Sequence, residues 1–451
     1  MLQKIEKILF YLFLFFIPFQ IRATVSWQGS EWGSKFLYLT DILLVIVLFL
    51  GIINTKLKGL RIKKSDLFLF LFLIIAVLSI FVSGDKAVSV FRWLKLLEFI
   101  ALYIYIMYRK GFLGLDKIFK TVVFGGVLQS ILAIAQFYKQ GSLGLKFIEA
   151  GSYTPGEAGV ATFISGTEKV MRAYGSFPHP NVLAAFLLLA IFCFFALWLS
   201  SLKNKKTDLP YAICYLLITF ALFLTFSREV IFTFIFISFI FFIFRFFQLR
   251  TFYHTEERLV TGKRMMVLAG FFVAFSIVSA IIISPYFKTR FVEISLEEEA
   301  IDLRFFYNKM AVEMIKEKPV SGIGIGTFAE YSREFPAYIR AANKIYNSGN
   351  LTGKQIPEWL YQPVHNIYLL IASEIGILGA LVFIVFVLMK FLKSIKPIKP
   401  KELFNLIGPM PFLFVGFLII GLSDHFSWTL QSGGIIFWLA IALARTEVSS
   451  D

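Results

Sequence analysis

Long apolar stretches alternate with short polar segments along almost the whole chain. A helix needs about 20 apolar residues to cross the ~30 Å hydrocarbon core of a bilayer. Apolar stretches that meet or approach this length occupy residues 6–21, 36–54, 66–83, 91–108, 118–137, 181–200, 210–226, 230–248, 265–284, 367–389, 405–423 and 433–445. The pattern predicts an all-α polytopic membrane protein with about twelve transmembrane helices.

The first apolar stretch has an alternative interpretation. Lys4 and Lys7 precede a short apolar core, which is also the pattern of a signal peptide. The segment 18–24 that follows offers no clear small-x-small cleavage site. We therefore expect a retained span at 6–21, with cleavage as the alternative.

One reversal of the chain follows from length alone. Residues 211–244 contain only two charged residues, Arg228 and Glu229. A single helix over this range would be ~50 Å long, which is far more than one bilayer crossing. The chain is therefore predicted to turn tightly at Ser227-Arg228-Glu229.

The composition excludes the main soluble classes. Of 451 residues, 58% are hydrophobic and only 16% are charged, with a mean hydropathy of +0.76. Soluble domains carry about 25% charged residues, so we exclude a soluble globule, a disordered chain and a secreted disulfide scaffold. Cys193 and Cys214 lie in apolar runs and are expected to be free, buried thiols.

The distribution of Lys and Arg predicts the orientation. With a cytoplasmic N-terminus, the inner segments hold 24 Lys and Arg residues and the short outer segments hold 10. Both termini are therefore expected in the cytoplasm. This topology and the anionic inner leaflet account for the net charge of +16 without nucleic acid.

Two long segments, 138–180 and 285–366, then lie outside, where we expect the functional residues. We divide the chain into transmembrane helices 1–9 (1–284), an extracytoplasmic loop (285–366) and transmembrane helices 10–12 (367–451).

The extracytoplasmic loop contains a predicted amphipathic helix that ends at Pro319. Leu303, Phe306, Met310 and Met314 recur at helical spacing. The acidic residues before them (Glu297, Glu298, Glu299 and Asp302) are interpreted as the solvated start of this helix rather than as a metal site.

The glycines Gly322, Gly324 and Gly326 follow the helix. No strand precedes them and the third is misplaced for a dinucleotide fingerprint. We expect a flexible turn.

Two polar features precede the loop. The segment from Arg172 to Asn181 leads into the sixth span, and Pro178 and Pro180 leave Asn181 as a favoured N-cap. Arg228 lies at the tight turn, where an unpaired guanidinium near hydrocarbon costs ~2.5–3.5 kcal/mol. Each has a structural alternative, namely a rigid helix entry for Arg172 and an interfacial position or a pair with Glu229 for Arg228.

Polar residues also cluster at the tenth span. His365 lies at its mouth, and Asn366 is a plausible N-cap. Glu374 follows eight residues later, ~12 Å into the membrane. An interfacial histidine is often only a satisfied polar group, but a carboxylate below it favours function. Asp424 and His425 lie on the same predicted side and are expected near the same cavity.

These residues suggest chemistry on a diphosphate. Guanidinium groups bind phosphate oxygens bidentately and stay charged, and a neutral imidazole accepts a proton from a hydroxyl. A pyrophosphate leaving group and an attacking sugar hydroxyl need both capacities. No outer loop carries an Asp-x-Asp pair, so we expect neither a metal nor another cofactor.

The chain resembles the superfamily of O-antigen ligases and O-antigen polymerases, bacterial envelope glycosyltransferases. The resemblance covers about 170–390. It rests on the order of four segments, Arg172-x-x-Gly-x-Phe-x-His-Pro-Asn181, Thr225-x-Ser-Arg228, Arg304 through Pro319, and His365-Asn366-x-Tyr-Leu with Glu374-x-Gly-x-x-Gly. In the family a Trp often follows the arginine that matches Arg304, whereas here the stretch reads Phe305-Phe306-Tyr307.

The resemblance implies a GT-C-type fold and an outward-facing active site. It implies metal-independent transfer of a glycan from an undecaprenyl-pyrophosphate carrier to a hydroxyl of a glycan or lipid-core acceptor. Arg228 and Arg304 would hold the pyrophosphate and His365 would act as general base. Arg172, Asn181, Asn366 and Glu374 would bind substrate.

Ligase and polymerase remain alternatives, because no residue identifies the acceptor. A lipid-linked oligosaccharide flippase or transporter is an alternative of another class. It predicts polar residues throughout the spans and broken helices near the midplane, whereas this sequence gathers its unusual charges on one side.

Overall fold

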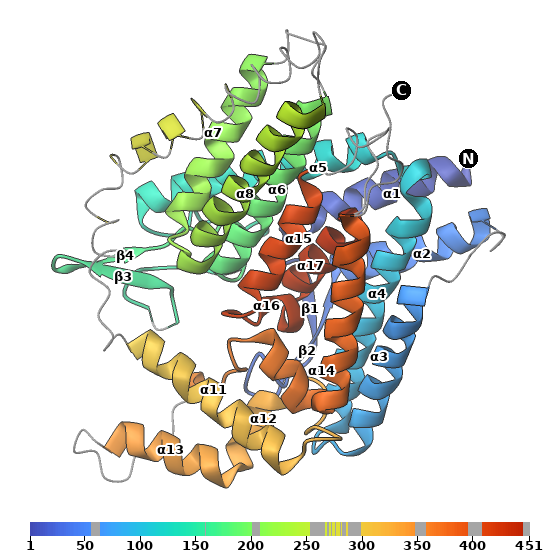
Figure 1. Ribbon diagram of the computed structural model, residues 1–451. Helices are drawn as coiled ribbons and strands as arrows, with labels where there is room; N and C mark the ends of the chain where they lie inside the picture. The colour runs from blue at the N-terminus through green and yellow to red at the C-terminus, as the bar shows by residue number, and fades with distance from the viewer. Residues whose placement is uncertain are drawn as a thin grey trace.

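The computed structural model describes residues 1–55, 64–157, 159–200, 208–252, scattered positions within 267–286, and residues 299–347, 358–395 and 408–444. Most of this chain is helical (Figure 1). The elements are α1 (Leu2–Phe16), β1 (Arg22–Ser26), β2 (Lys35–Tyr38), α2 (Leu39–Thr55), α3 (Lys64–Phe81), α4 (Lys86–Leu113), α5 (Leu115–Lys139), β3 (Thr162–Ser165), β4 (Glu168–Met171), α6 (Pro180–Ser200), α7 (Asp208–Leu224), α8 (Arg228–Phe252), α11 (Glu299–Glu317), α12 (Phe328–Glu334), α13 (Pro336–Asn347), η3 (Glu358–Leu360), α14 (Ile367–Ser394), α15 (Met410–Ile420), α16 (Phe426–Thr429) and α17 (Gln431–Leu443).

Helices lie in all the predicted apolar stretches except 265–284, which falls largely outside the described residues. Within the described part, four helices are long and apolar enough to cross a membrane: Leu115–Lys139, Pro180–Leu199, Arg228–Phe247 and Ile367–Ser394. Shorter apolar helices include α2, α15 and α17. The mostly helical fold is confirmed, while the number of crossings stays a prediction.

The expectation of an all-α chain is wrong in detail, because two small antiparallel hairpins are present. Strand β1 pairs with β2, and β3 pairs with β4 with Ser165 opposite Glu168. The second hairpin turns through Gly166, whose φ of 63° is accessible to glycine without strain. The second hairpin lies in segment 138–180, which was predicted to be an outer loop, whereas β2 takes up the first residues of the predicted span 36–54.

Helix α6 forms the centre of the bundle. Its side chains are apolar on every face, and nearly all of them are buried. It packs against α5, α7, α8, α15 and α17. Cys193 of this helix and Cys214 of α7 are free thiols, as expected.

The predicted reversal at Ser227 is confirmed. Helix α7 ends at Leu224 and α8 begins at Arg228, with Phe226 between them at a φ of 46°. The turn is tight enough that its backbone enters the left-handed region at a phenylalanine.

The amphipathic helix of the extracytoplasmic loop is also confirmed as α11. Phe306, Met310 and Met314 are buried in a second hydrophobic cluster, separate from the main core. This cluster joins α11 to residues of α12, α13 and the first turn of α14. The second cluster therefore anchors the loop helices on the end of α14, where all three lie at the bottom of Figure 1.

The glycine run after α11 is a close-packed turn rather than the flexible one that was expected. A Cβ on Gly322 would lie 2.3 Å from the carbonyl oxygen of Glu374, and one on Gly324 would lie 2.5 Å from the Ser83 side chain. Helix α14 is broken opposite this turn at Gly376, which has φ 84° and ψ 166°. The backbone N–H groups of Ile323 and Gly324 donate to the carbonyls of Ser373 and Glu374 at 2.9 Å, so the loop fills the break.

Candidate functional site

A cavity of about 680 Å³ lies where several loops and helix ends meet. Its walls come from parts of the chain that are far apart in sequence. They include the β1–β2 hairpin, residues 150–159, the entry to α6, the start of α11, the segment before α14 and the segment before α17. Its polar lining residues are Gln20, Arg22, Glu31, Tyr38, Tyr153, Arg172, His179, Asn181, Arg304, Tyr307, Gln362, His365, Asp424, His425 and Gln431.

A chain of hydrogen bonds runs through one wall. Arg172 donates through Nε to the Thr225 carbonyl at 2.7 Å and through Nη2 to Asn181 Oδ1. Asn181 Nδ2 donates in turn to Asp424 Oδ2 at 2.7 Å. The outer ends of α6, α7 and α15 are therefore fixed to one another by polar side chains.

Asn181 does not act as the N-cap that was predicted. Helix α6 begins one residue earlier, at Pro180, which is well suited to the first helical position. The Asn181 side chain is thereby released from the backbone and spans Arg172 and Asp424 instead.

Arg304 faces the cavity from the first half of α11. Its Nη2 lies 3.6 Å from Glu229 Oε2, and 40% of its side chain is exposed. Arg228 adjoins Glu229 at the start of α8 but is not among the cavity-lining residues. The structure thus brings Arg172, Arg304 and His365 into one cavity and places Arg228 beside the ion pair of Arg304.

His365 lies in the same cavity, just before α14. Its Nδ1 is buried and has no hydrogen-bond partner among the described residues. Its ring stacks on Tyr307 at 5.7 Å between centroids and meets the edge of His425 at 4.7 Å. Tyr307 is held by a hydrogen bond from its hydroxyl to the Leu360 carbonyl at 2.9 Å.

Three histidines of the cavity have strongly lowered pKa values. Burial lowers the pKa of His365 to about 3, and the neighbouring His425 and Arg304 act in the same direction. Burial and Arg172 lower the pKa of His179 to about 3, and burial lowers that of His425 to about 4. All three imidazoles are neutral at pH 7 in the absence of a bound anion.

Asp424 stays ionised near these histidines. Its pKa is held below the usual range because nearby His425 and His365 and the Asn181 amide outweigh its burial. Its Oδ1 accepts the backbone N–H groups of His425 at 2.7 Å and Phe426 at 3.2 Å. The expectation that Asp424 and His425 lie near the site is confirmed.

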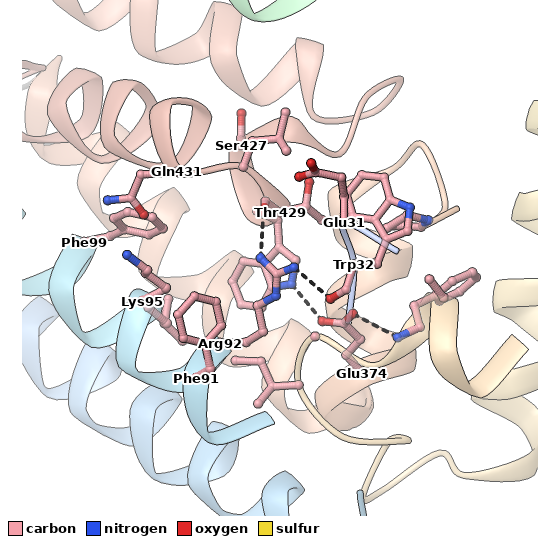
Figure 2. Close-up of a pocket in the computed structure, with 18 of the residues that line it drawn as sticks. Glu31, Trp32, Phe91, Arg92, Lys95, Phe99, Glu374, Ser427, Thr429 and Gln431 are labelled. Atoms are coloured by element: carbon pink, nitrogen blue, oxygen red, sulfur yellow. Dashed lines mark hydrogen bonds between the residues drawn. The ribbon is translucent and has the colours of Figure 1, made fainter. Parts of the chain in front are cut away.

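Glu374 and Asn366 lie outside the large cavity. Asn366 Oδ1 accepts the N–H groups of Tyr368 and Leu369 at 3.0 Å, which confirms it as the N-cap of α14. Glu374 lines a smaller cavity of about 60 Å³ together with Arg92 and Trp32 (Figure 2). The substrate-binding roles of both residues stay predictions.

Several lining residues were missed from the sequence. Arg22 and Glu31 form a bidentate ion pair with N–O distances of 2.9 and 2.6 Å on the β1–β2 hairpin. His179 belongs to the motif from Arg172 to Asn181, but the sequence analysis predicted no role for it. Arg22 and Glu31 follow the first span on its predicted outer side. This position was the one feature of the sequence that could have indicated that they line the site.

The cavity supplies fixed cations, neutral imidazoles and an ionised carboxylate in one enclosed space. Among the residues that the structure describes, no group of three or more His, Cys, Asp or Glu side chains is arranged to hold a metal ion. The arrangement suits an anionic ligand beside a group that accepts a proton.

A comparison with protein families gives one match. Residues 213–384 match the family model described as O-antigen ligase. The matched range includes Arg228, Arg304, His365 and Glu374, and it excludes Arg172, Asn181 and Asp424. No curated protein matches the chain.

Proposed function

We propose, from the match of residues 213–384 to the O-antigen ligase family model, that the chain is a metal-independent, inverting glycosyltransferase of the bacterial inner membrane. It moves a glycan from an undecaprenyl-pyrophosphate carrier to an acceptor hydroxyl at the outer leaflet. The observation that carries the proposal is the convergence of Arg172, Arg304 and His365 on one 680 Å³ cavity.

Arg304 binds the donor pyrophosphate. Its 3.6 Å separation from Glu229 is longer than an ordinary N–H···O hydrogen bond, so its guanidinium fork is available to phosphate oxygens. Arg228, one residue before Glu229, supplies the second cation. Their charges stabilise the negative charge that grows on the leaving diphosphate.

His365 takes the proton of the acceptor hydroxyl as that oxygen attacks the anomeric carbon. Its buried Nδ1 has no hydrogen-bond partner among the described residues, which leaves a nitrogen for the hydroxyl. A pKa of about 3 belongs to the empty cavity. A bound diphosphate adds negative charge beside the imidazole, which raises its pKa toward the operating pH.

The remaining parts of the proposal concern the whole chain. Both termini lie in the cytoplasm, about twelve helices cross the membrane in a GT-C-type fold, and residues 1–284, 285–366 and 367–451 form three parts. The helices of the loop close over the donor sugar and keep water out. Arg172 and Asn181 support the substrate from the wall, and Asn366 positions the start of α14 next to His365.

The break in α14 is the one feature that the flippase or transporter alternative also predicts. Here the freed carbonyls of Ser373 and Glu374 accept N–H groups of Ile323 and Gly324. The break is thus filled by protein and needs no transported ion.

Reconstitution tests the proposal. Purified full-length protein is mixed with an undecaprenyl-pyrophosphate-linked glycan and acceptor, with and without EDTA, and the products are separated on a gel. A single shifted acceptor band identifies a ligase, and a ladder of lengths identifies a polymerase. Complete loss of product with EDTA contradicts metal independence, and the absence of product in every condition contradicts the glycosyltransferase.

A further inference from the structure

The small cavity adjoins the large one. Aromatic side chains form part of its lining, among them Trp32, Phe91 and Phe99 (Figure 2). The two cavities share five lining residues: Glu31, Trp32, Tyr38, Leu430 and Gln431. Trp32 lies in this common wall and meets His425 edge-on at 5.4 Å between ring centroids. His425 in turn contacts His365, the proposed base, at 4.7 Å.

Arg92 supplies hydrogen-bond donors to the small cavity from α4. Its Nη1 donates to the Thr429 carbonyl and its Nη2 to the Trp32 carbonyl, each at 3.0 Å. Among the described residues no carboxylate forms an ion pair with it. The hydrogen bonds to these two carbonyls fix the plane of the guanidinium group. They therefore also fix the directions of its remaining N–H groups.

Glu374 supplies an acceptor. Its side chain is buried, and Oε2 accepts the indole N–H of Trp428 at 2.9 Å. Oε1 accepts a long hydrogen bond of 3.4 Å from the backbone N–H of Phe328, and the backbone N–H of Gly326 also interacts with the carboxyl group. No cation pairs with Glu374 among the described residues, so this carboxylate and the Arg92 guanidinium flank one space (Figure 2).

The lining offers a ligand no excess of either charge. Glu31 is paired with Arg22 and Lys95 with Asp41, so the Arg92 guanidinium and the Glu374 carboxyl group are the ionisable groups that remain for a ligand. A guanidinium opposite a carboxyl group gives a net anionic or cationic ligand little advantage. The cavity therefore favours a neutral group that both accepts and donates hydrogen bonds.

The size of the small cavity limits which neutral groups it can hold. An engineered cavity of ~150 Å³ holds one benzene molecule, so a cavity of about 60 Å³ is too small for a sugar ring. It has room for an exocyclic substituent of a few heavy atoms.

We propose that the small cavity recognises an acetamido substituent on the sugar held in the large cavity. The amide oxygen accepts from Arg92, the amide N–H donates to Glu374, and the methyl group packs against the aromatic walls. The inference rests on the proposed function, because it assigns the sugar class of the same site. It makes the chain selective for N-acetylated amino sugars over the corresponding hydroxyl sugars.

Saturation-transfer NMR on the purified full-length protein tests this pocket. The probes are methyl N-acetyl-β-glucosaminide and methyl β-glucoside, which differ in one substituent. We expect the acetamido methyl protons to receive the strongest saturation and the glucoside to compete about tenfold more weakly. Equal binding of the two sugars overturns the inference.

Two variants and one control test whether the sugar preference arises in the small cavity. Arg92→Gln removes the guanidinium donors, and Ala329→Leu fills the small cavity from its wall without removing a polar group. Both are expected to abolish the roughly tenfold preference, while Arg340→Gln, at an exposed position of α13, keeps it. An unchanged preference in Ala329→Leu, with a wild-type elution profile, contradicts the assignment.

A parallel transfer assay separates this inference from the proposed function. Normal transfer without discrimination between the two sugars contradicts the acetamido pocket and remains consistent with the proposed glycosyltransferase. Selective binding without transfer supports the pocket and contradicts the proposed function.

Discussion

His365 has an unusual position for a buried polar side chain. Buried nitrogens are almost always hydrogen-bonded, yet its Nδ1 has no partner among the described residues. The ring itself is well fixed, between Tyr307 and His425. A fixed ring with a vacant nitrogen fits a base whose partner arrives with the substrate.

Replacing His365 with Ala is expected to lower the rate of transfer by about 10²–10⁴-fold, the usual contribution of a general base. Donor binding should be unchanged, because the cations that hold the diphosphate remain. Single-turnover transfer and equilibrium donor binding are measured on the same preparation, with Arg340→Ala as the surface control. Transfer at the wild-type rate contradicts a role for His365 as base.

The lowered histidine pKa values also predict how stability depends on pH. His425 has a pKa of about 4 in the folded protein against ~6.5 when unfolded. As the pH falls below 6.5, the unfolded chain takes up a proton that the folded chain does not, so stability decreases toward pH 4. The loss approaches about 1.4 kcal/mol per pH unit for such a group.

Thermal unfolding of the detergent-solubilised protein between pH 7 and 4.5 measures this effect. The midpoint of the wild type should fall with decreasing pH, and His425→Asn should show a shallower fall. Parallel curves for the two proteins contradict the assignment of the pH dependence to His425.

At the scale of elements, α14 and the glycine turn depend on each other. Gly376 has a backbone conformation that only glycine adopts readily. A Cβ there would lie 2.0 Å from the Val320 carbonyl oxygen. The break lets the turn after α11 insert against α14, and this insertion sets the position of Arg304 relative to His365.

Gly376→Ala is therefore expected to destabilise the protein by at least ~3 kcal/mol, from backbone strain and from the displaced turn. Gly111→Ala is the matched control, since a Cβ at Gly111 meets nothing within 4 Å in the last turn of α4. The control should be neutral or stabilising by up to about 1 kcal/mol. Equal unfolding midpoints for the two variants contradict the account of the break.

The sequence predicts the helices and much of the site for one physical reason. Hydrocarbon tolerates few charges, so Arg172 and His365 stand out beside apolar stretches, and Arg304 stands out in the long polar segment between two of them. The roles of Arg92 and Trp32 could not be predicted in this way, because their positions are set by contacts across the fold, such as the Arg92 hydrogen bond to Thr429. The packing of Gly322 against Glu374 is likewise a long-range contact that no local pattern encodes.

At the scale of the whole molecule, the N-terminus and the loop helices lie at different ends. The N-terminus lies at the upper right of Figure 1, away from α11, α12 and α13 at the bottom. Buried ion pairs join the helices to one another. Lys390 of α14 pairs with Asp66 of α3 at 2.9 Å, and Arg109 of α4 pairs with Glu6 of α1 at 2.8 Å. Breaking either pair leaves a buried charge, which is strongly destabilising.

The orientation is tested by labelling single cysteines in a background without Cys193 and Cys214. Thr167→Cys in the β3–β4 turn and Lys117→Cys in the first turn of α5 are both at exposed positions. A membrane-impermeant maleimide should label position 167 in spheroplasts and position 117 only after permeabilisation. The reverse pattern contradicts the proposed topology.

The central claim is that guanidinium groups at the large cavity hold the donor diphosphate. It is tested most directly by equilibrium binding of an undecaprenyl-pyrophosphate-linked glycan to the protein in nanodiscs. Arg304→Lys and Arg228→Lys keep the charge but lose the planar fork, and each is expected to weaken binding by at least about tenfold, whereas Arg340→Lys binds as tightly as the wild type. Wild-type affinity in both the Arg304→Lys and the Arg228→Lys protein would contradict the account.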